Sequence, residues 1–208
     1  MASISKSLEK LAREELCIKF ANTVAWRLRD PVEERAASPQ AMLEWLAGAG
    51  LADGQTVREV TTRWKQSPRD ARFFLKEAVE LREAIYSLFV AKIHARRADP
   101  AAAAILNAHL AGTVRGLALT SSRTTLKWCS TPRNVAPEAE ALLKPIAWSA
   151  AGLLMGSRAQ KVRQCQDERG CGWLFIDESR AQNRRWCSMG DCGNLAKSRR
   201  HYRRASAK

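Results

Sequence analysis

The sequence lacks the long apolar runs of a membrane protein. Its uncharged stretches are short, as from Ile146 to Gly156, whereas a helix that spans a bilayer needs roughly 20 apolar residues. The first twenty residues carry charge throughout, at positions such as Lys6, Glu9 and Lys10, so the apolar stretch of a secretory signal is missing as well. We therefore expect a soluble, cytoplasmic protein that does not act at a membrane.

Histidine is scarce, and the motifs of common enzyme classes are absent. The chain has 3 histidines, and His94, His109 and His201 fall in separate predicted helices and in the basic tail. The sequence contains no H-E-x-x-H motif, no G-x-S-x-G motif and no glycine-rich phosphate loop. We expect a protein that is not an enzyme.

Acidic residues are few relative to basic ones. The chain has 35 Lys and Arg against 21 Asp and Glu, which gives a formal charge of +14 and a pI near 10.1. Residues 158–208 hold 13 basic and 5 acidic residues, so 13 minus 5 leaves +8 in this segment. Such an excess is costly on a compact surface unless a polyanion neutralises it, which favours nucleic acid or an anionic membrane surface as the partner.

Proline marks the expected helix starts, because it is tolerated in the first turn and the residue before it can cap the open N–H groups. Four dipeptides fit this pattern: Ser38-Pro39, Ser67-Pro68, Asp99-Pro100 and, without a capping side chain, Ala136-Pro137. Apolar spacing predicts helices over 5–28 and 39–48, a helix of about seven turns after Ser67, and a last helix from Pro137 to about Val162.

The fold class follows from these helices. Two runs of strand-forming residues, 117–120 and 125–128, flank a short polar turn and predict a β-hairpin. Apolar residues make up 46% of the chain and charged residues 27%, a balance typical of a globular protein with a packed core. We expect a mainly α protein, with a helical N-terminal domain that contains this small hairpin.

Four of the six cysteines lie close together in the C-terminal quarter, at Cys165, Cys171, Cys187 and Cys192. In a reducing compartment such a group is more typical of metal ligands than of disulfides. Zinc takes four ligands in a tetrahedron, and two short loops supply two thiolates each while backbone N–H groups donate to sulfur. We predict one structural zinc ion. Cys17 and Cys129, in apolar surroundings, are expected to be buried thiols.

The residues around the cysteines predict a treble-clef-like module of a β-hairpin plus a helix. Residues 173–176 read as one strand, 184–186 as the returning strand, and Leu195 to Arg204 as a helix. One side of that helix carries Leu195, Arg199 and Tyr202, which we expect to cover the small core. The other side is expected to face solvent and carries Lys197, Arg200, His201 and Arg204.

Seven residues of this module are candidate nucleic-acid contacts: Arg184, Arg185, Asn194, Lys197, Arg200, His201 and Arg204. The cations suit phosphates, and the amide of Asn194 suits a base edge. Other interpretations stay open: a merely solvated face, an RNA-binding module, or a docking platform for an acidic protein or lipid. RNA would be favoured by exposed aromatic rings, but Trp173, Phe175 and Trp186 are expected in the small core, so DNA is preferred.

The motif around the cysteines is specific. It runs W-L-F-I-D-E-S from Trp173, R-R-W-C-S-M from Arg184 and C-G-N from Cys192, with Lys197 following. It closely resembles the CGNR zinc finger of bacterial proteins that also carry an N-terminal ABATE domain, a family described as stress-related transcription regulators. The front half is similar to an ABATE domain in three segments: L-C-I-K-F-A-N-T from Leu16, Trp26-Arg27, and Trp45 to Leu51.

The chain departs from that family at two positions. Leu195 stands where the family name has arginine, which removes one cation from the predicted contact surface. Lys19 stands where relatives usually carry an acidic residue, so a ligand site built on that acid would be altered.

The resemblance implies a DNA-binding regulator with an ABATE-like regulatory domain over 1–157 and a zinc finger over 158–208. A helical domain can hold a small effector between its helices, and Asn22, Thr23, Trp26 and Arg27 are the candidate lining. The alternative is that Asn22 and Thr23 only hydrogen-bond within a packed helix bundle. A homodimer is one possible assembly.

Overall fold

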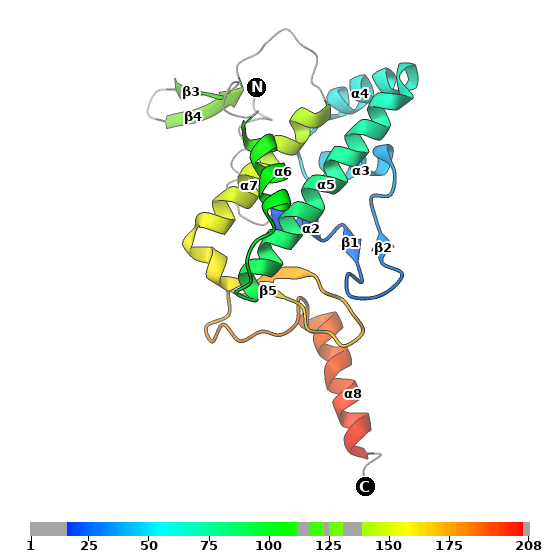
Figure 1. The fold of residues 1–208 in the computed structure, drawn as a ribbon, viewed down its shortest axis with the longest axis vertical. Helices are drawn as coiled ribbons and strands as arrows, with labels where there is room; N and C mark the ends of the chain where they lie inside the picture. Colours follow the sequence, from blue (N-terminus) through cyan, green and yellow to red (C-terminus); the bar gives the residue numbers. More distant parts are fainter. Residues whose placement is uncertain (1–15, 112–116, 123–124, 131–138, 206–208) are drawn as a thin grey trace.

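The computed structural model describes residues 16–111, 117–122, 125–130 and 139–205, with 117–122, 125–130 and 200–205 described by their backbone alone. It is mostly helical, as predicted, and the long helix α5 runs through its centre (Figure 1). The α-helices are α2 (Leu16–Ala21), α3 (Pro39–Gly48), α4 (Gly54–Gln66), α5 (Pro68–Ile93), α6 (Pro100–Ala111), α7 (Lys144–Met155) and α8 (Asn194–Ala205). None of the helices in these ranges is both long and apolar enough to cross a bilayer.

The remaining elements are short. Three antiparallel pairs form from β1 (Val24–Ala25) and β2 (Glu33–Glu34), from β3 (Leu117–Ser122) and β4 (Thr125–Ser130), and from β5 (Val162–Gln164) and β6 (Leu174–Ile176). The β3–β4 pair is the hairpin predicted from the sequence, with Leu117 opposite Ser130. Two 3-10 helices, η2 (Ala139–Leu143) and η3 (Ser157–Lys161), and one π-helical turn, η4 (Met189–Gly193), complete the set. The side chain of Cys129, in β4, lies outside the described part.

Side-chain caps explain the starts of α3 and α6, whereas Ser67 before α5 makes no side-chain cap hydrogen bond and only its proline fits the prediction. The Ser38 hydroxyl accepts a hydrogen bond from the Ala41 N–H (3.1 Å) at the start of α3, and the Asp99 carboxylate accepts one from Ala101 (2.9 Å) at α6. The sequence analysis missed α4, whose first turn is capped in the same way by Asp53 (2.8 Å to the Thr56 nitrogen). The signal was present, since Val60 and Trp64 lie one turn apart and are both buried.

Two predicted helices end earlier than expected. The first ends at Ala21, because both the backbone N–H and the hydroxyl of Thr23 donate to the Phe20 carbonyl and turn the chain aside. The last ends at Met155, where Gly156 takes an extended conformation (φ −78°, ψ 164°) and leads into η3. Pro145 lies in the first turn of α7 and not at a kink. The chain therefore reaches the cysteine module through a turn and a strand, not through one continuous helix.

The core forms around the apolar stripe of α5 that the sequence predicted. The stripe residues Phe74, Ala78, Leu81, Ile85 and Leu88 are all buried. They pack in one cluster with residues of α2, α3 and α7, of which the largest are Phe20, Met42, Leu43, Leu46 and Ile146. Because the cluster draws on most of the helices, α5 acts as the common support for the helical part.

The cysteine module joins this same core. Strands β5 and β6 pair antiparallel, with Val162 opposite Ile176, and they bracket the first cysteine loop. Val162, Leu174 and Ile176 are buried in the cluster that contains α5. The predicted returning strand at 184–186 is wrong, because β6 pairs with the earlier β5 and residues 184–186 are irregular. The hairpin therefore attaches the module to the helical part.

We expect Leu174→Ala to lower the free energy of unfolding by about 2–5 kcal/mol, the usual cost of removing a fully buried leucine side chain. Leu174 is 1% exposed, whereas Leu195 on α8 is 39% exposed. Leu195→Ala is the matched control and should change stability by no more than about 0.5 kcal/mol. Urea unfolding of the zinc-loaded protein, followed by circular dichroism, measures both. Equal effects would show that β6 does not share the core.

Candidate metal centre

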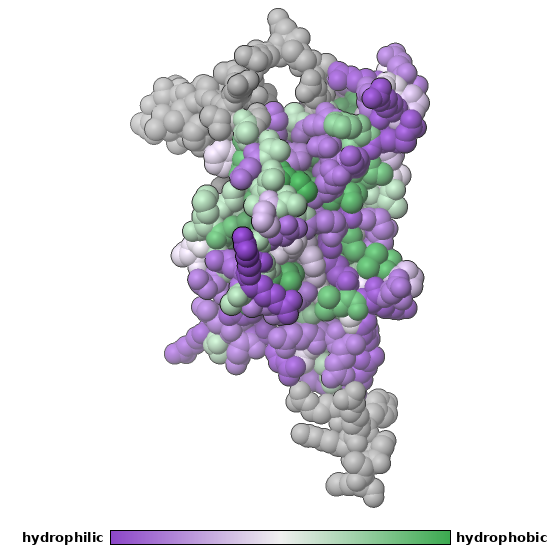
Figure 2. Space-filling view, viewed as in Figure 1, coloured by the Kyte–Doolittle hydropathy of each residue, from purple (hydrophilic) through white to green (hydrophobic). Residues whose placement is uncertain are grey.

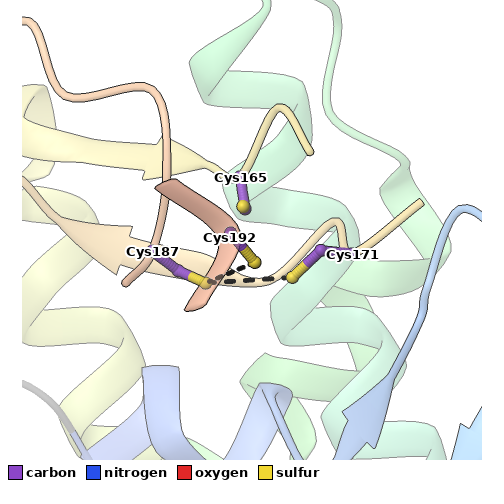
Figure 3. Close-up of side chains that lie close together, drawn as sticks. All are labelled: Cys165, Cys171, Cys187 and Cys192. Atoms are coloured by element: carbon purple, nitrogen blue, oxygen red, sulfur yellow. Dashed lines mark hydrogen bonds between the residues drawn. The ribbon is translucent and has the colours of Figure 1, made fainter. Parts of the chain in front are cut away.

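Four separate segments bring the cysteine sulfurs together (Figure 3). Cys165 follows β5, Cys171 precedes β6, Cys187 lies in the irregular segment after β6, and Cys192 lies in η4. All four sulfurs lie within 4.8 Å of one another, and the Cys171–Cys187 and Cys187–Cys192 pairs are 3.8 Å apart. Zinc–sulfur bonds of about 2.3 Å place tetrahedral ligands about 3.8 Å apart. The four cysteines, none of them in a disulfide, therefore form a site for one structural zinc ion, as predicted.

The protonation of these thiols shows why the site needs a cation. Hydrogen bonds from Cys171 and Cys187 hold the pKa of Cys165 well below its usual value. The pKa of Cys187 is raised in turn, because interactions with the Cys165 and Cys171 sulfurs favour its protonated form and because burial and the neighbouring thiolate charge oppose its ionisation. Four sulfurs this close cannot all ionise without a cation, and a bound dication stabilises them all as thiolates.

Backbone N–H groups support the sulfurs, as the sequence analysis expected. The N–H groups of Cys187 and Asp167 donate to the Cys165 sulfur, and the N–H of Trp173 donates to the Cys171 sulfur. Cys165 is thus supported from both cysteine loops, and Cys171 by the residue that leads into β6. These donors orient the thiolates and lower their charge density.

An ion pair next to the cluster, between Asp167 and Arg169, was not predicted from the sequence. The guanidinium of Arg169 holds the buried Asp167 carboxylate (Nη2 to Oδ2, 2.6 Å), and the same Nη2 is 4.0 Å from the Cys192 sulfur. Burial would raise the pKa of Asp167, but the hydrogen bonds from Arg169 hold it below its usual value. Four thiolates and one Zn²⁺ leave a charge of −2, so a nearby Arg169 cation offsets part of it. The D-x-R spacing after Cys165 was the available signal.

A buried aspartate organises the loop after β6. Asp177 is fully buried, and its carboxylate accepts hydrogen bonds from the Ser179 N–H and hydroxyl (3.0 and 2.6 Å) and from the Arg184 N–H (2.8 Å). Burial alone would raise its pKa, but these hydrogen bonds hold it below the usual range. The D-E-S motif therefore shapes the loop that carries the chain to Cys187.

The predicted nucleic-acid residues divide into three groups. Arg185 and Lys197 are exposed, and so is Asn194, whose side-chain amide donates to the Gly190 carbonyl (3.3 Å) at the start of α8. Arg184 turns inward, with its guanidinium 5.1 Å from the Phe175 ring centre and bonded to the Cys187 carbonyl (3.1 Å), so it supports the module instead. Arg200, His201 and Arg204 belong to α8, but their side chains lie outside the described part.

The orientation of α8 differs from the expectation that one side would cover the small core. The helix extends away from the body of the protein beyond η4 (Figure 1). Leu195 is 39% exposed and Arg199 is exposed as well. Trp26, Trp173, Trp186 and Phe175 cover the cysteine cluster in its place. Sequence periodicity could not reveal this, because Trp26 is distant along the chain.

The four residues predicted to line a ligand pocket lie instead where the helical part meets the cysteine module. The side-chain amide of Asn22 bonds both ways with the Leu174 backbone of β6 (3.0 and 2.8 Å). Thr23 is buried and accepts from the Arg82 guanidinium (3.2 Å), and Trp26 packs on the cysteine cluster. Arg27 binds the Ala21 carbonyl and the Glu83 carboxylate (2.6 Å each). The side chains of Asn22, Thr23 and Arg27 are hydrogen-bonded within the protein, so with Trp26 they act as junction residues.

The junction also contains buried charge. The Arg82 side chain is only 3% exposed and is held by the Glu34 carboxylate (2.6 Å) and the Glu83 carboxylate (2.8 Å). Burial would raise the pKa of Glu83, but the guanidinium groups of Arg27 and Arg82 hold it below its usual value. Both acids therefore balance the two arginines that face the module.

The thiol of Cys17 is separate from the metal site and has no role in it. It is fully buried in the main core, and burial raises its pKa to about 12. A thiol with so high a pKa stays protonated and unreactive at neutral pH. The expectation of a buried thiol is confirmed for Cys17.

Comparison with protein-family models gives two matches. Residues 14–157 match the ABATE model, described as "Putative stress-induced transcription regulator", and residues 161–205 match the CGNR zinc finger. The first match alone covers more than half of the 208 residues. The predicted boundary between 157 and 158 falls at the edge of the first match. A search of curated proteins found no match.

We expect each single Cys→Ser change at the four ligands to abolish zinc binding and unfold the module, because structural zinc contributes on the order of 10 kcal/mol to folding. Metal analysis of the purified protein should give one zinc per chain for the wild type and none for the variants. Cys17→Ala, which alters a cysteine of the core, should keep its zinc. A metal-free protein with a folded C-terminal module would contradict the assignment.

Proposed function

Because the chain belongs to the ABATE family and carries a CGNR zinc finger, we propose that it is a transcription regulator that binds DNA through its zinc module. The single observation that carries the proposal is the placement of α8. This helix begins two residues after the ligand Cys192 and leaves the protein body with its described cations in solvent. The zinc site thus fixes the start of a helix that extends away from the protein body.

The size of α8 suits a DNA groove. At about 1.5 Å per residue, its 12 residues span roughly 18 Å. The major groove of B-DNA is about 12 Å wide and admits one α-helix. Because α8 extends beyond the rest of the chain (Figure 1), the helical domain would not block its approach to a duplex.

The charge of this region fits a polyanion. From Asn194 to Lys208 the chain has six Lys and Arg residues and no Asp or Glu. Lys197 and Arg199 are exposed on α8, and Arg185 is exposed on the neighbouring loop. Hydrophilic side chains gather on the body where α8 emerges (Figure 2). Lys and Arg that neutralise phosphates release counterions, which gives affinity with little dependence on sequence.

DNA is favoured over RNA by the positions of the aromatic rings. Single-stranded RNA is commonly bound by bases that stack on exposed aromatic side chains. In this module Phe175 is buried, and Trp173 and Trp186 are half-buried against the cysteine cluster. Rings in these positions are committed to covering the metal site, so a duplex read by α8 is the better candidate.

A catalytic role is not part of this proposal. Four cysteine ligands complete the tetrahedral coordination of zinc and leave no open position for water or substrate. A small-molecule effector of the helical domain and a homodimer remain predictions from the sequence, and neither is needed for α8 to reach DNA.

We expect Lys197→Ala and Arg199→Ala each to weaken binding to all duplex sequences and to reduce the magnitude of the salt slope, d log K/d log [salt], by about 0.9, the value for one lost phosphate contact. Fluorescence anisotropy with labelled duplex DNA over a range of salt concentrations measures the slope. Lys65→Ala, an exposed lysine on α4 far from α8 (Figure 1), is the matched control and should leave it unchanged.

The same assay separates the competing functions. Duplex DNA should compete with the labelled probe more strongly than single-stranded RNA of equal length. Stronger competition by RNA would overturn the DNA assignment, and an unchanged slope in both α8 variants would show that this helix does not contact phosphate.

A further inference from the structure

We propose that segment 22–28 of the helical domain positions the zinc-binding loop 170–173, so that the zinc affinity of the module is linked to the conformation of the helical domain. The inference concerns the metal site and its neighbour in the fold, and it stands whether or not the module binds DNA. A zinc finger usually folds around its metal with its own residues. Here the loop that carries the ligand Cys171 is also held by residues nearly 150 positions earlier in the chain.

Backbone hydrogen bonds hold this loop on both sides of Cys171. The Arg27 N–H donates to the carbonyl of Cys171 itself (3.0 Å), and the Leu28 N–H donates to the Gly170 carbonyl (3.0 Å). These two bonds join a turn of the helical domain to a zinc-ligand loop. Movement of either stretch must therefore break or bend the contacts of the other.

The glycines of the loop allow this close approach. Gly172 has a φ of +64°, and a Cβ there would lie 2.8 Å from the Leu28 Cγ and 3.1 Å from the Arg27 Cβ. Gly170 has a φ of +92°, and a Cβ there would lie 3.0 Å from the Leu28 carbonyl oxygen. Only a residue without a side chain combines these conformations with this contact. The loop is thus shaped to lie against segment 22–28 as well as to hold a metal.

One hydroxyl on α5 links both ends of the first cysteine loop. The Tyr86 hydroxyl donates to the Gly172 carbonyl (2.9 Å) and accepts from the Gln164 side-chain amide (2.7 Å). Gln164 precedes the ligand Cys165, and Gly172 follows the ligand Cys171. The Arg27 guanidinium lies 3.9 Å from the centre of the Tyr86 ring and holds it in place. A single side chain of the helical domain therefore sets the separation of two ligand-bearing segments.

Trp26 extends the contact to the cluster itself. Its ring packs against the cysteine side chains, and the Arg169 guanidinium lies 5.0 Å from the ring centre while also approaching the Cys192 sulfur (4.0 Å). Trp26 has a φ of 55°, which is uncommon for a bulky side chain and persists only where tertiary contacts hold it. The left-handed turn at Trp26 is what points this ring at the module.

Thermodynamic linkage between zinc binding and the conformation of segment 22–28 follows from these contacts. If zinc stabilises the loop conformation that segment 22–28 binds, then segment 22–28 must stabilise zinc binding by the same factor. Asn22, which pairs with the Leu174 backbone, and Tyr86 are positioning residues in this scheme. Neither touches the metal, and both act through the segments that carry its ligands.

The test measures the zinc affinity of the full chain by equilibrium competition with a colorimetric chelator. Tyr86→Phe keeps the ring beneath Arg27 and removes only the hydroxyl, and Asn22→Ala removes the pairing with β6. Both variants should bind one zinc per chain with an affinity about tenfold weaker than that of the wild type, within the usual range of coupling between sites. Asn107→Ala, an exposed asparagine on α6, is the matched control and should bind zinc with the wild-type affinity.

A second readout separates positioning from a general loss of stability. The urea midpoint of Tyr86→Phe should fall below that of the wild type when zinc is bound, and the difference should shrink after chelation. In the wild type, chelation should speed hydrogen exchange at the Arg27 and Leu28 amides.

Should Asn22→Ala fail to fold with zinc present, the result for Tyr86→Phe alone decides the test. A wild-type zinc affinity in Tyr86→Phe, or a midpoint difference unchanged by chelation, would overturn the proposal. No measurement here involves nucleic acid, so the DNA assignment is tested independently.

Discussion

The repulsion among four cysteine sulfurs is the constraint on which the C-terminal module depends. Held within 4.8 Å of one another, they cannot all ionise unless a dication lies between them. The four ligands come from four different segments, so the metal joins parts of the chain that are separate in the sequence. The direction of α8 follows from it, because this helix starts beside the ligand Cys192.

The module is nevertheless more than a small domain closed by zinc. Val162, Leu174 and Ile176 belong to the same core as α5, and the cysteine cluster is covered in part by Trp26 from the helical domain. Between these apolar contacts lies a polar junction in which Arg27 and Arg82 are balanced by Glu34 and Glu83. A helical domain attached this firmly can transmit a change in its own structure to the base of α8, which a flexible linker could not.

The division of charge matches this arrangement. The inward-facing arginines of the module, Arg169 and Arg184, stabilise the metal site and the loop that follows it. The outward-facing cations, Arg185, Lys197 and Arg199, remain in solvent around the base of α8. The same residue type therefore serves two purposes, and the cations with exposed side chains are the ones available to a polyanion. Arg185 combines the two, since its guanidinium also donates to the Gln166 side chain (2.9 Å).

The sequence by itself determined the features that depend on local chemistry. Cysteine spacing predicted the zinc ligands, the Ser38-Pro39 cap and the apolar stripe of α5 predicted their helices, and the motif after Trp173 identified the family. Tertiary structure decided the rest. The first helix ends at Ala21 because Thr23 turns the chain toward the module, β6 pairs with β5 instead of residues 184–186, and Arg184 faces inward while Arg199 faces solvent. The exposed position of Arg199 depends on a partner distant along the chain, because Trp26 takes the place on the cysteine cluster that α8 was expected to fill. The other three depend on specific hydrogen bonds, such as those from Thr23 to the Phe20 carbonyl, and apolar periodicity carries no information about either kind of contact.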